Sequence, residues 1–346
     1  MNNKQKIVIA ALVVLLLAAT AFMLYSLGVF GKKGQKTPSL PSQVEEGERI
    51  SRLDRTWRLI FETEEQTIDL SRKKEEGKYI WTLTDDENFP ISTDKVNSIA
   101  SAFSGMHSIE KIELKDGAEE LKKYGLDQPV AWLTAGDAKE NEQRMKLLFG
   151  DLTGEKYKGD DLIYVSIEDE PEVVYKVVNN ILPQFEEGLY GLAKYADIPT
   201  INEGNIEKLS IKGEKSTEFT LKTEVVFSED ADGKKSKSRQ TVWYCGETKV
   251  ERSSIQKLYE QLCHLTLTKM VSFDKECKNY GEYGLNAPSA LIVVHYLDLQ
   301  EQEQQFSLKI SQSGSLCYIA KDDDGAVYEV KGDAVNEILN IANKGL

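Results

Sequence analysis

A short motif that occurs twice limits the fold of this chain more than any other feature of its sequence. Its two occurrences lie 159 residues apart, at Tyr124, Gly125, Leu126 and Pro129 and again at Tyr283, Gly284, Leu285 and Pro288. The same spacing aligns two apolar stripes of helical period, which are Val96, Ile99, Phe103 and Met106 and then Ile255, Leu258, Leu262 and Leu265. Because the similarity extends over both motif and helix, we predict two tandem copies of one folding unit.

The motif itself predicts a junction between a helix and a strand. Its glycine can take the left-handed conformation that ends a short helix, here expected over residues 118–125. Its proline cannot continue a helix and favours extended backbone before it. The segments that follow, VAWLTA and SALIVVHY, are rich in strand formers. We therefore interpret the eight motif residues as structural and not as ligand-binding.

Strands are indicated where side chains alternate between two faces. Trp57, Leu59 and Phe61 share one face of a predicted strand, with Arg58, Ile60 and Glu62 on the other. This alternation is typical of antiparallel sheets with one buried face. Each copy is therefore predicted to be α+β, a mainly antiparallel sheet with helices on one face. The polar stretch 228–238 is expected to be an extended loop inserted in the second copy.

A long apolar run lies near the start of the sequence. Residues 7–30 are 24 positions without a charge, enough for a helix to cross the hydrocarbon layer of a bilayer. A cleaved signal peptide is the alternative, because Ala19-Thr20-Ala21 has the form of a cleavage site. However, the apolar run continues for nine residues beyond it. We expect an uncleaved transmembrane helix. The lysines on both sides barely set its orientation, but a very short tail before a single anchor usually stays inside and the rest is exported.

These features give a predicted organisation for the whole chain. It comprises a cytoplasmic tail (1–6), a transmembrane helix (7–30), a linker (31–48), a first α+β repeat (49–200) and a second (201–346). The expected location is the cell membrane, with a single pass, lipid contact through residues 7–30 and the bulk of the chain outside the cytoplasm. The net charge of −14 argues against nucleic acid as a partner, since phosphate binding needs a basic surface.

Residues that could carry chemistry are few and scattered. The histidines match no zinc-binding spacing, and the cysteines form no C-x-x-C. All four cysteines lie in the second copy, so the shared fold does not need a disulfide; two disulfides stay open, but free thiols are favoured. We predict no catalytic residue, no metal, no cofactor and no enzymatic activity. The three histidines are His107, His264 and His295, and the four cysteines are Cys245, Cys263, Cys277 and Cys317.

Two Asp-Gly pairs mark predicted hairpin turns, at Asp232-Gly233 and Asp324-Gly325. The second follows Asp322 and Asp323, so this acidic cluster could attract calcium. An EF-hand would need alternate ligands and a glutamate at its twelfth position, whereas here the chain enters a strand. We therefore favour a polar hairpin tip.

Several pieces of the sequence together resemble the bacterial domain-of-unknown-function 4340 (DUF4340) family. They are the two motifs, Gly150, the pairs Tyr164-Val165 and Tyr318-Ile319, and the strands 174–177 and 327–330. The resemblance extends over roughly residues 50 to 340, although Ser311 to Gly314 depart from the pattern set by Phe149-Gly150-Asp151. It implies a membrane-anchored accessory protein of an ABC-type export or gliding-motility system, and it supplies no catalytic residues.

Three functions follow as expectations. The first is a non-catalytic extracytoplasmic protein that acts by protein–protein contact, with a membrane protein such as an ABC-type permease as partner. The second is an extracytoplasmic ligand binder with a site between the two repeats, lined by aromatic residues such as Trp132, Tyr190 or Tyr195. An envelope hydrolase is the third and least favoured, because the sequence offers no nucleophile or metal constellation.

Overall fold

The structure is a computed structural model that describes residues 47–346 except 54, 116–117, 137–142, 203 and 230–234. The predicted transmembrane helix (7–30) and nearly all of the linker lie outside the described residues. Within the part of the chain that is described, no helix has the length and apolar character needed to span a bilayer.

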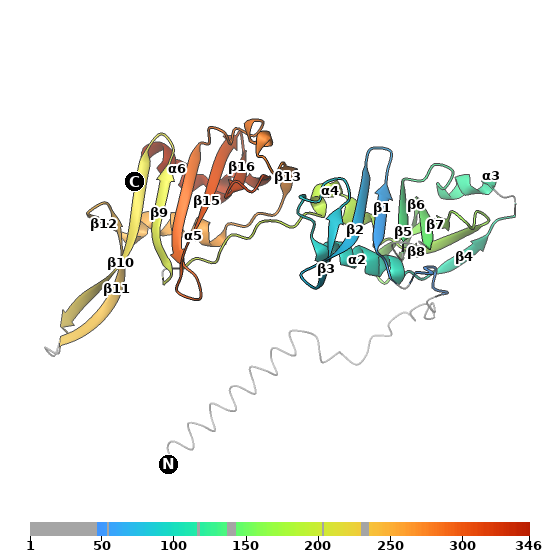
Figure 1. Cartoon of the computed structure of the whole chain (residues 1–346), viewed down its shortest axis with the longest axis horizontal. Coiled ribbons are helices and arrows are strands. Elements are labelled where there is room, and N and C mark those ends of the chain that lie inside the picture. Colours follow the sequence, from blue (N-terminus) through green and yellow to red (C-terminus); the bar gives the residue numbers. More distant parts are fainter. Residues whose placement is uncertain (1–46, 54, 116–117, 137–142, 203, 230–234) are drawn as a thin grey trace, which may run out of the picture. The chain divides into compact units, whose positions relative to one another are not determined.

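The first repeat contains an eight-stranded sheet in the order β3-β2-β1-β5-β6-β7-β8-β4 (Figure 1). All neighbouring strands are antiparallel. In β1, Leu59 and Phe61 are buried and their neighbours are half-buried, which confirms the predicted alternation. The strands are β1 (Arg58–Glu62), β2 (Thr67–Glu75), β3 (Lys78–Leu83), β4 (Glu110–Glu113), β5 (Ala131–Gly136), β6 (Arg144–Tyr157), β7 (Asp160–Ile167) and β8 (Val173–Val178).

The second repeat contains a nine-stranded antiparallel sheet in the order β12-β11-β10-β9-β14-β15-β16-β17-β13. Without the edge strand β12, this order is that of the first sheet, strand for strand. The α+β class and the internal duplication are thus seen in the topology. The strands are β9 (Ile206–Lys212), β10 (Ser216–Glu229), β11 (Lys235–Cys245), β12 (Thr248–Val250), β13 (Met270–Phe273), β14 (Ala290–Leu297), β15 (Glu303–Ser313), β16 (Leu316–Lys321) and β17 (Ala326–Lys331).

One long helix in each repeat packs its apolar stripe into the core. Both stripes are buried as predicted, Val96, Ile99 and Phe103 in one helix and Ile255, Leu258 and Leu262 in the other. Met106 and Leu265 are also buried but follow the last helical residue. The α-helices are α2 (Thr93–Ser104), α3 (Ala118–Leu121), α4 (Gly188–Gly191), α5 (Arg252–His264) and α6 (Asn336–Lys344). The 3-10 helices are Lys122–Tyr124, Leu182–Phe185, Lys278–Gly281 and Gly332–Ala334.

The insertion in the second repeat differs from its prediction. Residues 228–229 and 235–238 were expected in a loop, but they belong to strands β10 and β11. Eleven residue pairs join these two strands, from Phe219 and Cys245 to Glu229 and Lys235. The polar composition concealed the strands because hydrogen bonding between them does not require a buried face. The predicted turn at Asp232-Gly233 lies outside the described residues.

Candidate functional site

A groove with a volume of about 790 Å³ lies in the second repeat, between α5, the start of α6 and the end of β17. We call it the α5–α6 groove. Its apolar lining includes the buried residues Leu265 and Val330. Its polar lining comes from α5 and from the opposite wall, as Lys257, Glu260, Gln261, His264, Lys269, Glu329, Lys331, Asp333, Asn336 and Glu337.

The polar wall of the groove follows from the periodicity of α5. Lys257, Glu260, Gln261 and His264 are three and four residues apart, so they share one face of the helix. The neighbouring face carries the buried apolar stripe. The core stripe therefore fixes the rotation of α5 and turns the polar face towards the groove.

Gln261 joins the two walls of the groove. Its side-chain nitrogen donates to the backbone oxygen of Asp333 at 2.9 Å, and its side-chain oxygen accepts from the backbone nitrogen of Glu337 at 3.0 Å. The helix α6 begins after Val335, whose side chain provides no cap. Since the first N–H groups of a helix have no partner within it, Gln261 supplies a cap from another helix.

We expect Gln261→Ala to lower the free energy of unfolding by about 1 to 2 kcal/mol, because the start of α6 loses its cap. Urea denaturation followed by circular dichroism measures the loss. Gln256→Ala on the same helix is the matched control, since the hydrogen bonds described for its side chain are with Arg252 and Glu260 of α5 itself. An equal loss in both variants would contradict the capping role.

An ion pair lies at one end of the groove. The amine of Lys269 is 2.7 Å from a carboxylate oxygen of Glu329. Hydrogen bonding to Glu329 raises the pKa of Lys269, so this lysine stays charged. The groove therefore combines an apolar centre with paired and exposed charges of both signs, which suits a polypeptide surface better than a single ion.

The first repeat has a smaller groove at the corresponding place, about 380 Å³, between α2 and the chain that follows β8. Here Lys95 donates to the backbone oxygens of Gly191 (2.7 Å) and Ala193 (3.2 Å). Its amine also lies 4.3 Å from the ring centre of Tyr195, and burial lowers its pKa. Lys95 thus holds the chain segment after α4 beside α2. The 159-residue spacing places Ser254 at this position in the second repeat, where the groove is wider.

The eight predicted motif residues do not line the α5–α6 groove. Gly125 and Gly284 have positive φ angles of 68° and 71°, and Leu126 and Leu285 are buried. In both repeats the motif tyrosine packs edge to face against a strand tyrosine with ring centres 4.9 Å apart, Tyr124 on Tyr164 and Tyr283 on Tyr318. The motif therefore packs a helical turn onto β7 in one repeat and onto β16 in the other.

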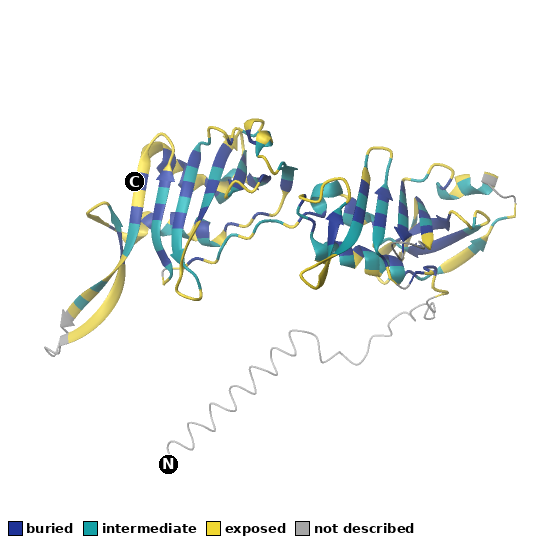
Figure 2. Cartoon of the chain, viewed as in Figure 1, coloured by how far each residue is buried: buried dark blue, intermediate teal, exposed yellow. Residues whose placement is uncertain are grey.

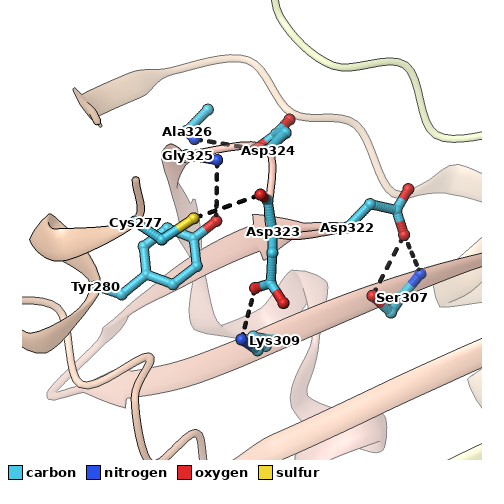
Figure 3. A network of polar contacts seen from close by, with 9 residues as sticks. All are labelled: Cys277, Tyr280, Ser307, Lys309, Asp322, Asp323, Asp324, Gly325 and Ala326. Atoms are coloured by element: carbon cyan, nitrogen blue, oxygen red, sulfur yellow. Dashed lines mark hydrogen bonds and ion pairs between the residues drawn. The ribbon is translucent and has the colours of Figure 1, made fainter. Parts of the chain in front are cut away.

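The acidic segment Asp322 to Gly325 forms the turn between β16 and β17 (Figure 3). Its carboxylates bind donors of the protein itself: Asp322 accepts from the Ser307 backbone nitrogen at 2.6 Å, and Asp323 pairs with Lys309 at 2.5 Å. Asp324 accepts from the backbone nitrogen of Ala326 at 2.9 Å. These contacts make it a polar hairpin tip tied to its neighbouring strand.

The histidines and cysteines are distributed over several elements of the fold. His107 and His264 bond backbone oxygens near the ends of α2 and α5, and His295 lies on β14. All four cysteines are free thiols, of which only Cys317 is buried. Across the described residues, no three His, Cys, Asp or Glu side chains form a group that could hold a metal ion.

The fold and its groove define a class: an α+β protein made of two copies of one antiparallel module, with a larger groove in the second copy. The family model of DUF4340, a domain of unknown function, matches residues 81–241 and confirms the resemblance seen in the sequence. No curated protein and no solved structure matches the chain.

The matched stretch corresponds to one period of the duplication. It begins in β3 and ends in β11, which takes the place of β3 in the second sheet. Trp81 and Trp243 are both buried on these two strands. The match is shorter than the range of roughly 50 to 340 expected from the motifs, and it crosses the boundary between the repeats.

Proposed function

We propose that this protein is a non-catalytic, membrane-anchored extracytoplasmic protein that acts by protein–protein contact, as an accessory of an ABC-type transport or envelope system. The α5–α6 groove is its docking site. The observation that carries the proposal is the difference between the two grooves. In the first repeat, a segment of the protein's own chain is held beside α2, next to the smaller groove. The corresponding groove of the second repeat is about twice as large.

The chemistry of the groove supports a polypeptide as its occupant. Leu265 and Val330 offer an apolar contact, and exposed residues such as Lys257 and His264 surround it. Protein interfaces commonly have this arrangement of an apolar centre and a polar rim. A partner segment with an apolar side chain between charged residues fits it.

The membrane anchor and the class of partner come from the sequence. The uncharged run 7–30 has the length of a transmembrane helix, and the linker 31–48 would hold the repeats near the bilayer. The family resemblance implies an ABC-type permease or a related envelope component as partner. This last step is an analogy between family members.

Co-purification tests the proposal. The tagged full-length chain is isolated from its native membrane in a mild detergent, and the bound proteins are identified by mass spectrometry. We expect a permease subunit with the wild type and at least a fivefold lower yield with Lys257→Glu, because the charge on the groove wall is reversed. Lys215→Glu, on an exposed turn outside the groove, is the matched control and keeps the wild-type yield.

Two outcomes would contradict the proposal. One is recovery of the chain alone under conditions that preserve other membrane complexes. The other is an equal yield of partner with Lys257→Glu and with the wild type, which would place the contact outside the groove.

A further inference from the structure

The strands β10 and β11 extend beyond the sheet as a two-stranded arm. Strand β9 pairs with β10 only as far as Thr220, and β12 pairs with β11 only from Trp243 to Cys245. Among the described residues, 222–229 and 235–242 therefore pair only with each other. Figure 2 shows this arm as mostly exposed, in contrast to the buried positions of the adjoining sheet.

The arm is not a requirement of the fold. The corresponding strands β2 and β3 of the first repeat are 9 and 6 residues long, against 14 and 11 for β10 and β11. A two-stranded ribbon in water is only marginally stable by itself. A long arm that only one repeat carries therefore indicates a contact with something outside the chain.

The two faces of the arm differ in chemistry. One face, the Phe227 face, consists of Thr223, Val225 and Phe227 with their cross-strand partners Thr241, Arg239 and Lys237. Phe227 is 72 % exposed and Val225 is 45 % exposed. Between Thr223 and Phe227, this face thus presents an apolar pair beside two cations.

The other face is engaged within the protein. Glu224 accepts a hydrogen bond from the Tyr244 hydroxyl and pairs with Lys249 of β12 at 3.3 Å. The amine of Lys222 lies 4.9 Å from the ring centre of Tyr244. Only the Phe227 face therefore leaves both its apolar and its charged groups exposed to a partner.

We propose that the Phe227 face binds the surface of a bilayer that contains anionic lipids. An exposed aromatic side chain enters the boundary between headgroups and acyl chains, while neighbouring Lys and Arg side chains reach the phosphates. The local charge of the face is positive although the chain carries a net charge of −14, so this face complements anionic lipids.

The inference rests on the proposed membrane anchor, which keeps the arm close to the bilayer. The linker has 18 residues and spans at most about 60 Å when fully extended. A tether of this kind raises the effective concentration of the arm at the lipid surface, so that a weak contact becomes populated.

Fluorescence quenching in vesicles tests this inference. Full-length Phe227→Trp is reconstituted into vesicles of phosphatidylcholine with or without phosphatidylglycerol, and bromine-labelled lipids serve as quenchers. We expect the added tryptophan to be quenched in the anionic vesicles, well above the background of the four native tryptophans measured in the wild type. Quenching should be weaker in pure phosphatidylcholine and at high salt.

Two further variants make the test specific. Val226→Trp lies on the opposite face of the same strand and is expected to stay unquenched. Lys237→Gln combined with Arg239→Gln in the Phe227→Trp background is expected to weaken the contact roughly 25-fold, about fivefold for each cation.

The outcomes separate this inference from the proposed function. Failure of the full-length chain to float with the vesicles would contradict the anchor. Flotation with an unquenched tryptophan at position 227 would overturn the lipid contact, and it is the result expected if the arm binds a protein instead. Equal quenching at positions 226 and 227 would also overturn it.

Discussion

Gly284→Ala is expected to lower the free energy of unfolding of the second repeat by about 3 kcal/mol. Gly284 has a φ angle of 71°, which disfavours a side chain by about 1 to 2 kcal/mol. An added Cβ would also lie 2.5 Å from the hydroxyl oxygen of Ser311, so this hydroxyl would have to rotate away or β15 would have to shift. Overpacking of this kind destabilises by about 1 to 3 kcal/mol.

Urea unfolding separates the two contributions when a second glycine is used as control. Gly314 has a φ angle of 62°, but an added Cβ would have no atom within 4 Å. We expect Gly314→Ala to lose only about 1 kcal/mol, the backbone part alone. Ser311→Gly in the Gly284→Ala background should recover the packing part. Equal losses for Gly284→Ala and Gly314→Ala would show that the close approach to Ser311 does not contribute.

A loss of stability between pH 10 and pH 12 is the second large effect that we expect, and it arises from Tyr328. Burial raises the pKa of this tyrosine from 10.0 to about 12, and its hydroxyl oxygen accepts from the backbone nitrogen of Ala196 at 2.8 Å. The folded state keeps the phenol proton over a range in which the unfolded chain loses it. The contribution of Tyr328 to stability is therefore complete below pH 10 and is lost as the pH rises, by about 2.7 kcal/mol.

Urea titrations from pH 7 to pH 12 on wild type and Tyr328→Phe measure this effect. The variant is expected to be less stable by about 1 kcal/mol at pH 7, because the Ala196 N–H loses its acceptor. Its stability should then fall less steeply above pH 10, so that the two curves approach each other. Tyr79→Phe, an exposed position on β3, is the control and keeps the wild-type slope. Parallel curves for Tyr328→Phe and wild type would contradict the assignment.

The parts of the fold that sequence alone predicts are those set by local periodicity. The stripes on α2 and α5 were recognised because a helix that covers a sheet must repeat its apolar residues every three or four positions. The duplicated motif was recognised because Gly125 and Gly284 occupy the same left-handed turn in both repeats. The residues of each stripe and of each motif lie within a few positions of one another, and both patterns are retained although the two copies have diverged.

The candidate site could not be predicted because its residues come together only in the folded chain. Gln261 and Glu337 are 76 residues apart in sequence, and neither belongs to a recognisable motif. The extent of the arm was missed for a different reason. Residues 228–238 contain no apolar side chain except Ala231, so the alternation that reveals other strands is absent there.

The order of strands in each sheet also determines when that sheet can be completed. The strand that follows the long helix, β4 or β13, lies at the edge and pairs with the last strand, β8 or β17. During synthesis β4 has no neighbour until residue 178 has left the ribosome, and β13 has none until residue 331. The sheet of each repeat is therefore completed only when its last strand has been made, through a contact distant in sequence. This slows folding, and a truncated chain cannot complete its sheet.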